Sequence, residues 1–294
     1  MSSLNRLGEN TFYIDGVTNI GVYRYGGKCC LIDAGLDKGV AKHILELISE
    51  NSMELEKVFL THSHADHAGG CAYLKQQTGC EVFAPGVCAQ LVRYSFLIPT
   101  TLYGGYPNER MRSKFITPES CECAEITQGD LPEGLSFVHA DGHDFEQTAF
   151  KTDDGVWFVG DAVSDKETLD KYRISFLQNV GEHLDSLERL KTLEGNVFVP
   201  SHGVPVNEIN TLCEENIENV REVAETIKRL CKNGLSIDEL IERLLDEFNI
   251  RLYIMQYELV GATARSYLSY LAERKEIEYV FDGNKLMWKT AESS

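Results

Sequence analysis

Three imidazoles and one carboxylate lie within six positions of this chain, at His62, His64, Asp66 and His67. They follow the apolar stretch 58–60, which predicts a strand. A strand that ends in a tight loop can point all four side chains into one small volume, and imidazole nitrogens with a carboxylate oxygen suit zinc or another first-row divalent ion. An open catalytic zinc usually takes three protein ligands, so four suggest two metals. The alternative, a solvated loop that is His-rich by chance, is weaker because the chain has only 8 His.

Three further candidate ligands come later in the chain, each at the end of an apolar run. His143 follows residues 135–139, Asp161 follows 156–159, and His202 follows 197–200. Active-site side chains of layered α/β proteins lie at the ends of strands. We therefore expect these three residues to join the cluster at 62–67.

Together, the run His62-x-His64-x-Asp66-His67 and the three later positions resemble the signature of the metallo-β-lactamase superfamily of metallohydrolases. The matches stand in family order over roughly the first 210 residues, and the run 31–35 resembles the early strand of the family. The resemblance implies one metal on His62, His64 and His143, a second on Asp66, His67 and His202, and Asp161 as the bridge between them.

The resemblance also implies the chemistry. Two zinc ions per chain would share a hydroxide that attacks the substrate, with Asp66 as a catalytic residue that orients it. Family members that bind two irons for oxygen chemistry commonly place Glu where His64 stands, so this chain resembles the hydrolytic members. Iron or manganese also suits the same nitrogen and oxygen ligands.

The elements that must position these residues predict an α/β fold with the four-layer αββα sandwich of that family. The expected strands are 11–14, 20–25, 28–33, 57–60, 81–84, 135–139, 148–151, 156–159 and 196–199. The expected helices are 40–48, 68–77, 167–178 and 182–192. Two facing sheets covered by helices account for this order of elements.

The last part of the chain has a different pattern, which predicts two domains, 1–210 and 211–294. Helical runs at 213–231 and 260–271 enclose another that begins at Ser236, where Glu239 completes a capping box. Strand-like runs at 276–281 and 285–289 follow, so the tail resembles a winged helix. A nucleic-acid contact through Arg265 is one interpretation. A packing or homodimerisation module is the favoured one, because residues 211–294 hold 11 Lys and Arg against 16 Asp and Glu.

Composition narrows the class of protein. A net charge of −18 argues against tight nonspecific binding of nucleic acid, which depends on Lys and Arg. No apolar stretch is long enough for a membrane helix, and the first residues lack the apolar core of a secretory signal, so we expect a cytoplasmic protein. The nine Cys then predict reduced core thiols rather than disulfides. Metal binding by Cys121 and Cys123 is the less favoured alternative.

The stretch 93–114 is basic and aromatic, with Glu109 as its only acid, and it predicts a long loop at the mouth of the site. A solvated loop is the alternative. The candidates for substrate contact are Arg93, Tyr103, Tyr106, Arg110 and Arg112 in this stretch and His183 in a later helix.

Weaker expectations concern a few other positions. We expect His139 to be a buried strand residue, and Asp33 to be either a carboxylate that orients a ligand His or a residue of a strand-end turn. The acidic segment Asp144-Phe145-Glu146-Gln147, where many family members have small residues, should reshape the pocket wall.

Three functions agree with the sequence. The leading one is a hydrolase for a small, anionic ester, thioester or lactone, as in the glyoxalase II-like and lactonase-like branches. The alternative is a phosphodiesterase or ribonuclease of the same superfamily. A binding module on an inactive scaffold is the third, and the complete ligand set argues against it.

Overall fold

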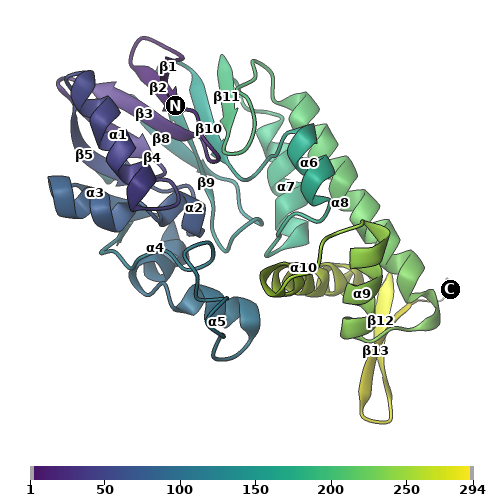
Figure 1. The fold of residues 1–294 in the computed structure, drawn as a ribbon. Helices are drawn as coiled ribbons and strands as arrows, with labels where there is room; N and C mark the ends of the chain where they lie inside the picture. Colours follow the sequence, from purple (N-terminus) through teal and green to yellow (C-terminus); the bar gives the residue numbers. More distant parts are fainter. Residues whose placement is uncertain (1–2, 292–294) are drawn as a thin grey trace.

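Two β-sheets face each other at the centre of the computed structural model, which describes residues 3–291 (Figure 1). Within these residues the first sheet has seven strands in chain order and the second has four, in the order β11-β10-β9-β8. The first sheet consists of β1 (Leu4–Arg6), β2 (Thr11–Ile14), β3 (Ile20–Tyr25), β4 (Lys28–Ile32), β5 (Glu54–Phe59), β6 (Glu81–Ala84) and β7 (Ala124–Glu125). The second consists of β8 (Leu135–His139), β9 (Thr148–Thr152), β10 (Val156–Gly160) and β11 (Val197–Pro200).

Strands β4 and β5 show why both faces of the first sheet are buried. Successive side chains of a strand point to opposite faces. In β4, Leu31 packs among the residues beneath the outer helices, while its neighbour Ile32 packs between the two sheets. In β5, Val58 and Phe59 divide in the same way, and Phe59 stacks on Phe83 and meets Phe150 of the second sheet.

Helices cover the outer face of each sheet, which completes the predicted αββα order of layers (Figure 1). The first half of the chain contains α1 (Lys38–Glu50), α2 (Ala65–Ala68), α3 (Cys71–Thr78), α4 (Gly86–Arg93), α5 (Leu97–Tyr103) and the short 3₁₀ helix η1 (Gln128–Asp130). The second half contains α6 (Lys166–Tyr172), α7 (Val180–Leu190) and α8 (Asn210–Leu230). Helix α1 turns Ala41, Ile44 and Ile48 to the first sheet.

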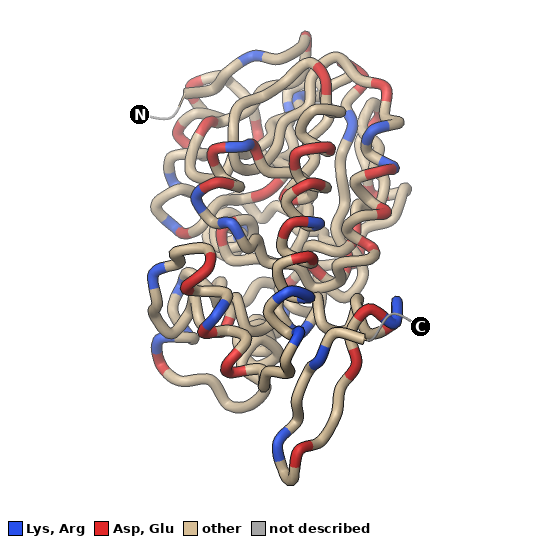
Figure 2. Tube along the Cα trace, turned by 90° about the vertical axis from the view of Figure 1, so that its right-hand side faces the viewer, with Lys and Arg blue, Asp and Glu red and all other residues tan. Residues whose placement is uncertain are grey.

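The C-terminal residues form the predicted helices and hairpin. They comprise the 3₁₀ helix η2 (Cys231–Asn233), α9 (Ile237–Glu247), α10 (Ile254–Glu273), β12 (Ile277–Asp282) and β13 (Lys285–Thr290). The capping box is present, because the Ser236 hydroxyl accepts the Glu239 N–H while the Glu239 carboxylate accepts from Ser236. Figure 2 shows Lys and Arg dispersed among Asp and Glu on the face of the second-sheet helices and the tail, with no continuous basic stripe in that view.

Helix α8 belongs to two hydrophobic cores. Its first half places Cys213 and Ile217 against the second sheet, and its second half places Val223 and Ile227 in the C-terminal core. The C-terminal core also takes up Leu177, which comes before α7. Because these contacts cross residue 210, the division into domains 1–210 and 211–294 stays a prediction.

Several expected element boundaries were wrong, and two of them concern the candidate site. The stretch 93–114 is not one long loop, because α5 forms within it. Pro99 lies in the first turn of this helix, where a missing N–H costs nothing, and Gly104 ends it in the left-handed region at φ 72°. The helix expected over 167–178 ends at Tyr172, because Arg173 adopts a positive φ of 51°. Residues 173–179 form an irregular strap before α7, here called the strap.

The structure also bears on the expected burial of His139 and on the expected state of the Cys residues. His139 is exposed at the end of β8, so its expected burial was wrong; a strand end next to solvent leaves its ring outside the core. All nine Cys are free and buried, and Cys121 and Cys123 pack in the apolar core beneath the first sheet. Across residues 3–291, we find no helix with the length and apolar character needed to cross a membrane.

Candidate metal centre

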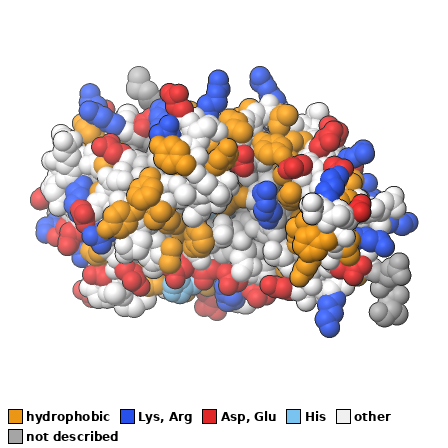
Figure 3. All heavy atoms as spheres, turned by 90° about the horizontal axis from the view of Figure 1, so that it is seen from below, with side chains coloured by type: hydrophobic (Ala, Val, Ile, Leu, Met, Phe, Trp, Pro, Cys, Tyr) orange, Lys and Arg blue, Asp and Glu red, His pale blue; other side chains and the backbone are white. Residues whose placement is uncertain are grey.

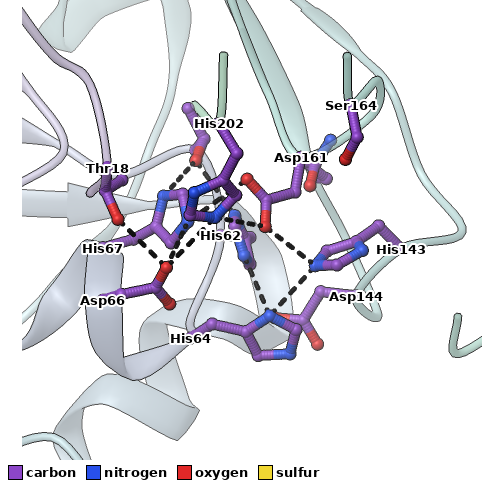
Figure 4. Close-up of polar contacts among 12 residues, drawn as sticks. Thr18, His62, His64, Asp66, His67, His143, Asp144, Asp161, Ser164 and His202 are labelled. Carbon is purple, nitrogen blue, oxygen red and sulfur yellow. Dashed lines mark hydrogen bonds and ion pairs between the residues drawn. The ribbon is translucent and has the colours of Figure 1, made fainter. Parts of the chain in front are cut away.

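Each predicted ligand lies at one edge of the two sheets, where strands end (Figure 4). His62 and His64 follow β5, and Asp66 and His67 lie on the single turn of α2. The other three ligands come from the second sheet: His143 from the β8–β9 connection, Asp161 from the end of β10 and His202 from the end of β11. The two sheets therefore bring residues up to 140 positions apart into one site.

One group of ligand atoms contains three imidazoles and a carboxylate, those of His62, His64, His143 and Asp161. His62 Nε2 and His143 Nε2 each lie 3.0 Å from the same atom, His64 Nδ1. A single ring nitrogen has one proton or one lone pair, so it cannot make two good hydrogen bonds at once. Convergence of three ring nitrogens is instead the arrangement that a shared cation requires.

A second group contains Asp66, His67 and His202. Asp66 Oδ2 lies 3.2 Å from His202 Nε2 and 3.6 Å from His67 Nε2. Asp161 faces both groups: its Oδ2 lies 3.4 Å from His143 Nε2 and 3.5 Å from His202 Nε2, and its Oδ1 lies 3.4 Å from His67 Nε2. The Asp161 carboxylate thus faces both groups of candidate ligands.

Two buried atoms support the interpretation that these residues bind a metal ion. His67 Nε2 and Asp161 Oδ1 have no hydrogen-bond partner among the described residues, although they face the same space. Buried polar atoms normally have a partner, and a divalent ion between them would supply one. The donor set of imidazole nitrogens and carboxylate oxygens suits zinc.

The pKa shifts of the candidate ligands also agree with metal binding. Burial lowers the pKa of His143 to about 4 and that of His62 well below its usual range, so both rings are neutral near pH 7, the form that binds a metal. The Asp161 carboxylate raises the pKa of His202 to about 11. Burial opposes charge on His67, but Asp33 and the nearby ligand carboxylates outweigh it and raise its pKa. The carboxylates therefore favour positive charge at His67 and His202, as they would favour a bound cation.

Asp33 holds His67 in place. Its Oδ2 lies 2.8 Å from His67 Nδ1, and its Oδ1 accepts the backbone N–H of Thr61 at 2.8 Å. Because an ionised carboxylate only accepts hydrogen bonds, His67 Nδ1 carries a proton, and Nε2 is the ring nitrogen that faces the candidate metal site. Asp33 is also the strand-end residue with φ 68°, so both interpretations of this position hold.

Sequence reasoning missed two other contacts that position ligands. The Thr18 hydroxyl donates to Asp66 Oδ2 at 3.0 Å, and His202 Nδ1 lies 2.7 Å from the carbonyl oxygen of Val17. Both come from the β2–β3 connection, which carries no motif. Only the packing of that connection against the end of β11 reveals them.

The acidic segment after His143 does shape the pocket wall, as expected. Asp144 is buried, and its Oδ2 accepts from the backbone N–H and the hydroxyl of Ser63, between the ligands His62 and His64. Phe145 is exposed and lines the cavity next to the ligands. Asp144 therefore ties the second-sheet loop to the first-sheet motif.

Gly142 is required by the backbone at this place. Its φ is 112°, and a Cβ there would lie 2.2 Å from the backbone nitrogen of His183. We expect Gly142→Ala to lower the free energy of unfolding by about 2 kcal/mol or more, because the strained φ adds to the clash. Thermal melting checks this. Gly79→Ala, at φ 75° with nothing within 4 Å of the added carbon, is the control for the strain alone. Equal losses in both variants would show that the close approach to His183 is unimportant.

A cavity of about 730 Å³ opens next to the ligands. His64 and Asp66 line it, together with residues of α5, the strap and the C-terminal helix α10. Its size lies within the range of small-molecule sites. The tail of the chain therefore forms part of the wall of the candidate active site.

Among the predicted substrate residues, the structure brings only Tyr103 to this cavity. Arg93 pairs with Glu122, and Arg112 donates to the Tyr106 hydroxyl and lies over its ring. Arg110 is exposed in the loop after α5, outside the lining. His183 is buried in α7 beside Gly142, and burial lowers its pKa to about 3.

Comparison with known families agrees with this site. Residues 13–202, well over half of the chain, match the Metallo-beta-lactamase superfamily. The chain therefore belongs to the metallo-β-lactamase superfamily, as the His and Asp motifs predicted.

Curated relatives match different portions of the chain. A "Beta-lactamase-like protein 2 homolog" of Drosophila melanogaster is 24% identical over 220 residues, which is 70% of this chain and 62% of that protein. A hydroxyacylglutathione hydrolase of Idiomarina loihiensis is 27% identical over 128 residues, 44% of this chain and 40% of that protein. One from Albidiferax ferrireducens is 42% identical over 50 residues, 17% and 20% of the two chains. The chain thus spans between a fifth and about three fifths of these relatives.

Solved structures share the fold. A beta-lactamase domain protein from Burkholderia ambifaria has a TM-score of 0.75 at 17% identity, with 98% of this chain and 93% of that one covered. A metallo-beta-lactamase family protein from Thermus thermophilus has a TM-score of 0.73 at 20% identity, with 98% and 96% covered. The metallo-beta-lactamase FIM-1 from Pseudomonas aeruginosa, in its mono-zinc form, covers only 76% of this chain, at a TM-score of 0.53 and 14% identity. The first two thus extend over the C-terminal helices as well.

Proposed function

We propose that this protein is a metal-dependent hydrolase with two zinc ions that cleaves an ester, thioester or lactone. The observation that carries the proposal is the position of the Asp161 carboxylate, which has a buried Oδ1 and lies within 3.5 Å of ligand nitrogens in both groups. His62, His64, His143 and Asp161 would hold one ion, and Asp66, His67, His202 and Asp161 the other. When bound, two such ions lower the pKa of a shared water and polarise the attacked carbonyl oxygen.

The side chains of the protein supply the remaining steps. Asp66 lines the cavity and is held by the Thr18 hydroxyl, so its carboxylate is placed to orient the attacking water. Hydrolysis adds the hydroxyl of water to the acyl carbon and a proton to the leaving oxygen or sulfur as the bond between them breaks. Arg265 is the one Lys or Arg in the described cavity lining, so it is the residue that would meet an anionic group of the substrate.

The relatives named hydroxyacylglutathione hydrolase support the thioester within this class. The alternative function is a phosphodiesterase or ribonuclease. Under that hypothesis, the third helix of the tail would contact nucleic acid. That helix, α10, instead turns Ala262, Arg265 and Ser266 to the cavity. This arrangement favours a small substrate enclosed between α10 and the ligands. A homodimer and a cytoplasmic location stay predictions.

The test is a paired assay of the zinc-loaded and the metal-free protein. We expect the zinc-loaded protein to hydrolyse S-lactoylglutathione with a higher kcat/KM than bis(p-nitrophenyl) phosphate, and the metal-free protein to hydrolyse neither. A clear preference for the phosphodiester would replace the carbonyl hydrolase with the phosphodiesterase. Equal rates with and without metal would contradict both.

A further inference from the structure

Part of the wall of the cavity beside the candidate metal ligands is apolar. Leu91 of α4, Ile98 and Leu102 of α5, and Ile116 contribute one part of it, and Phe176 of the strap and Leu259 of α10 contribute another. Leu91 is buried and the others are partly exposed to the cavity. Covering such a surface with an apolar group of a ligand is favourable, because it removes apolar area from water.

This apolar surface begins at the metal ligands. The Phe176 ring meets His64 edge-on at 5.3 Å between ring centroids, and it also meets His143, at 6.1 Å. The same ring lines the cavity with His64 and Asp66. A substrate carbonyl held at the ligands therefore has its next carbon atoms beside an aromatic ring.

The wall also continues to the surface of the protein. Phe115 is 59% exposed and Tyr103 is 41% exposed, yet both line the cavity. Figure 3 shows hydrophobic side chains gathered on the face that carries α5 and the C-terminal hairpin. An extended apolar group can thus run from the ligands, along α5, toward solvent.

We propose that this cavity binds an aliphatic acyl chain, and that the substrates are esters or thioesters of carboxylic acids with such a chain. The inference rests on the proposed hydrolase function and specifies its substrate class. A volume of about 730 Å³ is far larger than an acetyl or lactoyl group needs. The apolar positions lie on segments outside the metal motif, so they set specificity without changing the ligands.

The test is a chain-length series of p-nitrophenyl esters, from acetate through butyrate to octanoate, with the zinc-loaded protein and with spontaneous hydrolysis subtracted. We expect kcat/KM to rise by roughly two- to fourfold per added methylene until the cavity is filled. Titration calorimetry with octanoate and butyrate measures binding without turnover, and octanoate should bind more tightly.

Variants locate the effect in the cavity. Leu102→Asp places a carboxylate in the apolar wall, and it should lower kcat/KM for the octanoyl ester at least about tenfold while changing the acetyl ester less than about twofold. Leu286→Asp, on the exposed hairpin outside the cavity, should leave both rates unchanged. Leu102→Ala gives a smaller loss of the same kind if the charged variant does not fold.

Each outcome decides between the two proposals. Hydrolysis that does not depend on chain length, or equal losses for both esters in Leu102→Asp, would overturn the acyl-chain site and leave the hydrolase intact. No hydrolysis of any ester or thioester would contradict the proposed function itself, and the acyl-chain inference with it.

Discussion

Replacing Asp161 by Ala is expected to remove almost all hydrolytic activity. Among the residues that the structure describes, Asp161 is the carboxylate that faces both groups of ligands, at 3.4 Å from His67 Nε2 and from His143 Nε2. Without it, neither group keeps its full set of donors, and two ions have no bridge. We expect kcat/KM to fall at least about a hundredfold, because metal ions contribute several kcal/mol of transition-state stabilisation. His64→Ala should act in the same direction, since two ring nitrogens converge on its Nδ1.

Metal content, measured by mass spectrometry on protein loaded with zinc and then desalted, separates this effect from unfolding. The Asp161→Ala protein should hold less zinc than the two ions expected per chain, while melting as one cooperative unit. Asp185→Ala, an exposed position on α7, is the matched control and should keep full activity and zinc. Full activity of Asp161→Ala would end the two-metal assignment.

The second large effect is expected from Asp33→Asn. Asn tolerates the positive φ of this position, so the backbone can stay as it is. Its amide offers one acceptor oxygen, whereas the carboxylate serves both the Thr61 N–H and His67 Nδ1. If the amide oxygen faces Thr61, the amide N–H₂ faces His67 and moves the ring proton to Nε2, the ligand atom. If the amide turns over, the buried N–H of Thr61 loses its partner.

Zinc affinity should therefore fall by about ten- to a hundredfold in Asp33→Asn, the range found for groups that orient metal ligands. Competition with a chromophoric chelator measures this directly, and kcat/KM at limiting zinc should fall in parallel. Excess zinc should restore part of the activity, which it cannot do for Asp161→Ala. Unchanged zinc affinity would show that Asp33 serves only the strand-end turn.

Much of the fold could be predicted because the pattern and the packing agree. The apolar stretches that end in His or Asp became strands that end at one edge of the sandwich, since parallel strands present their carboxyl ends together. The sequence predicted the start of helix α9 from its capping box alone. The prediction failed where a local pattern was weak: Pro99 obscured α5, and the positive φ of Arg173 ended a helix that the sequence favoured.

The sequence by itself determined the donor atoms and their order, because a metal site is limited to few residue types at strand ends. It could not determine what surrounds them. The orientation of His67 by Asp33 and the support of Asp66 by Thr18 depend on how the segments of the first sheet come together. The wall formed by Phe176 depends on the packing of the strap and α10 against the ligands. The Arg residues of the stretch 93–114 lie outside the cavity for the same reason: packing brings α5 and α10, rather than Arg110 and Arg112, to it. Tertiary structure therefore decided the cavity beside the candidate ligands, since its lining comes from residues distant in the chain.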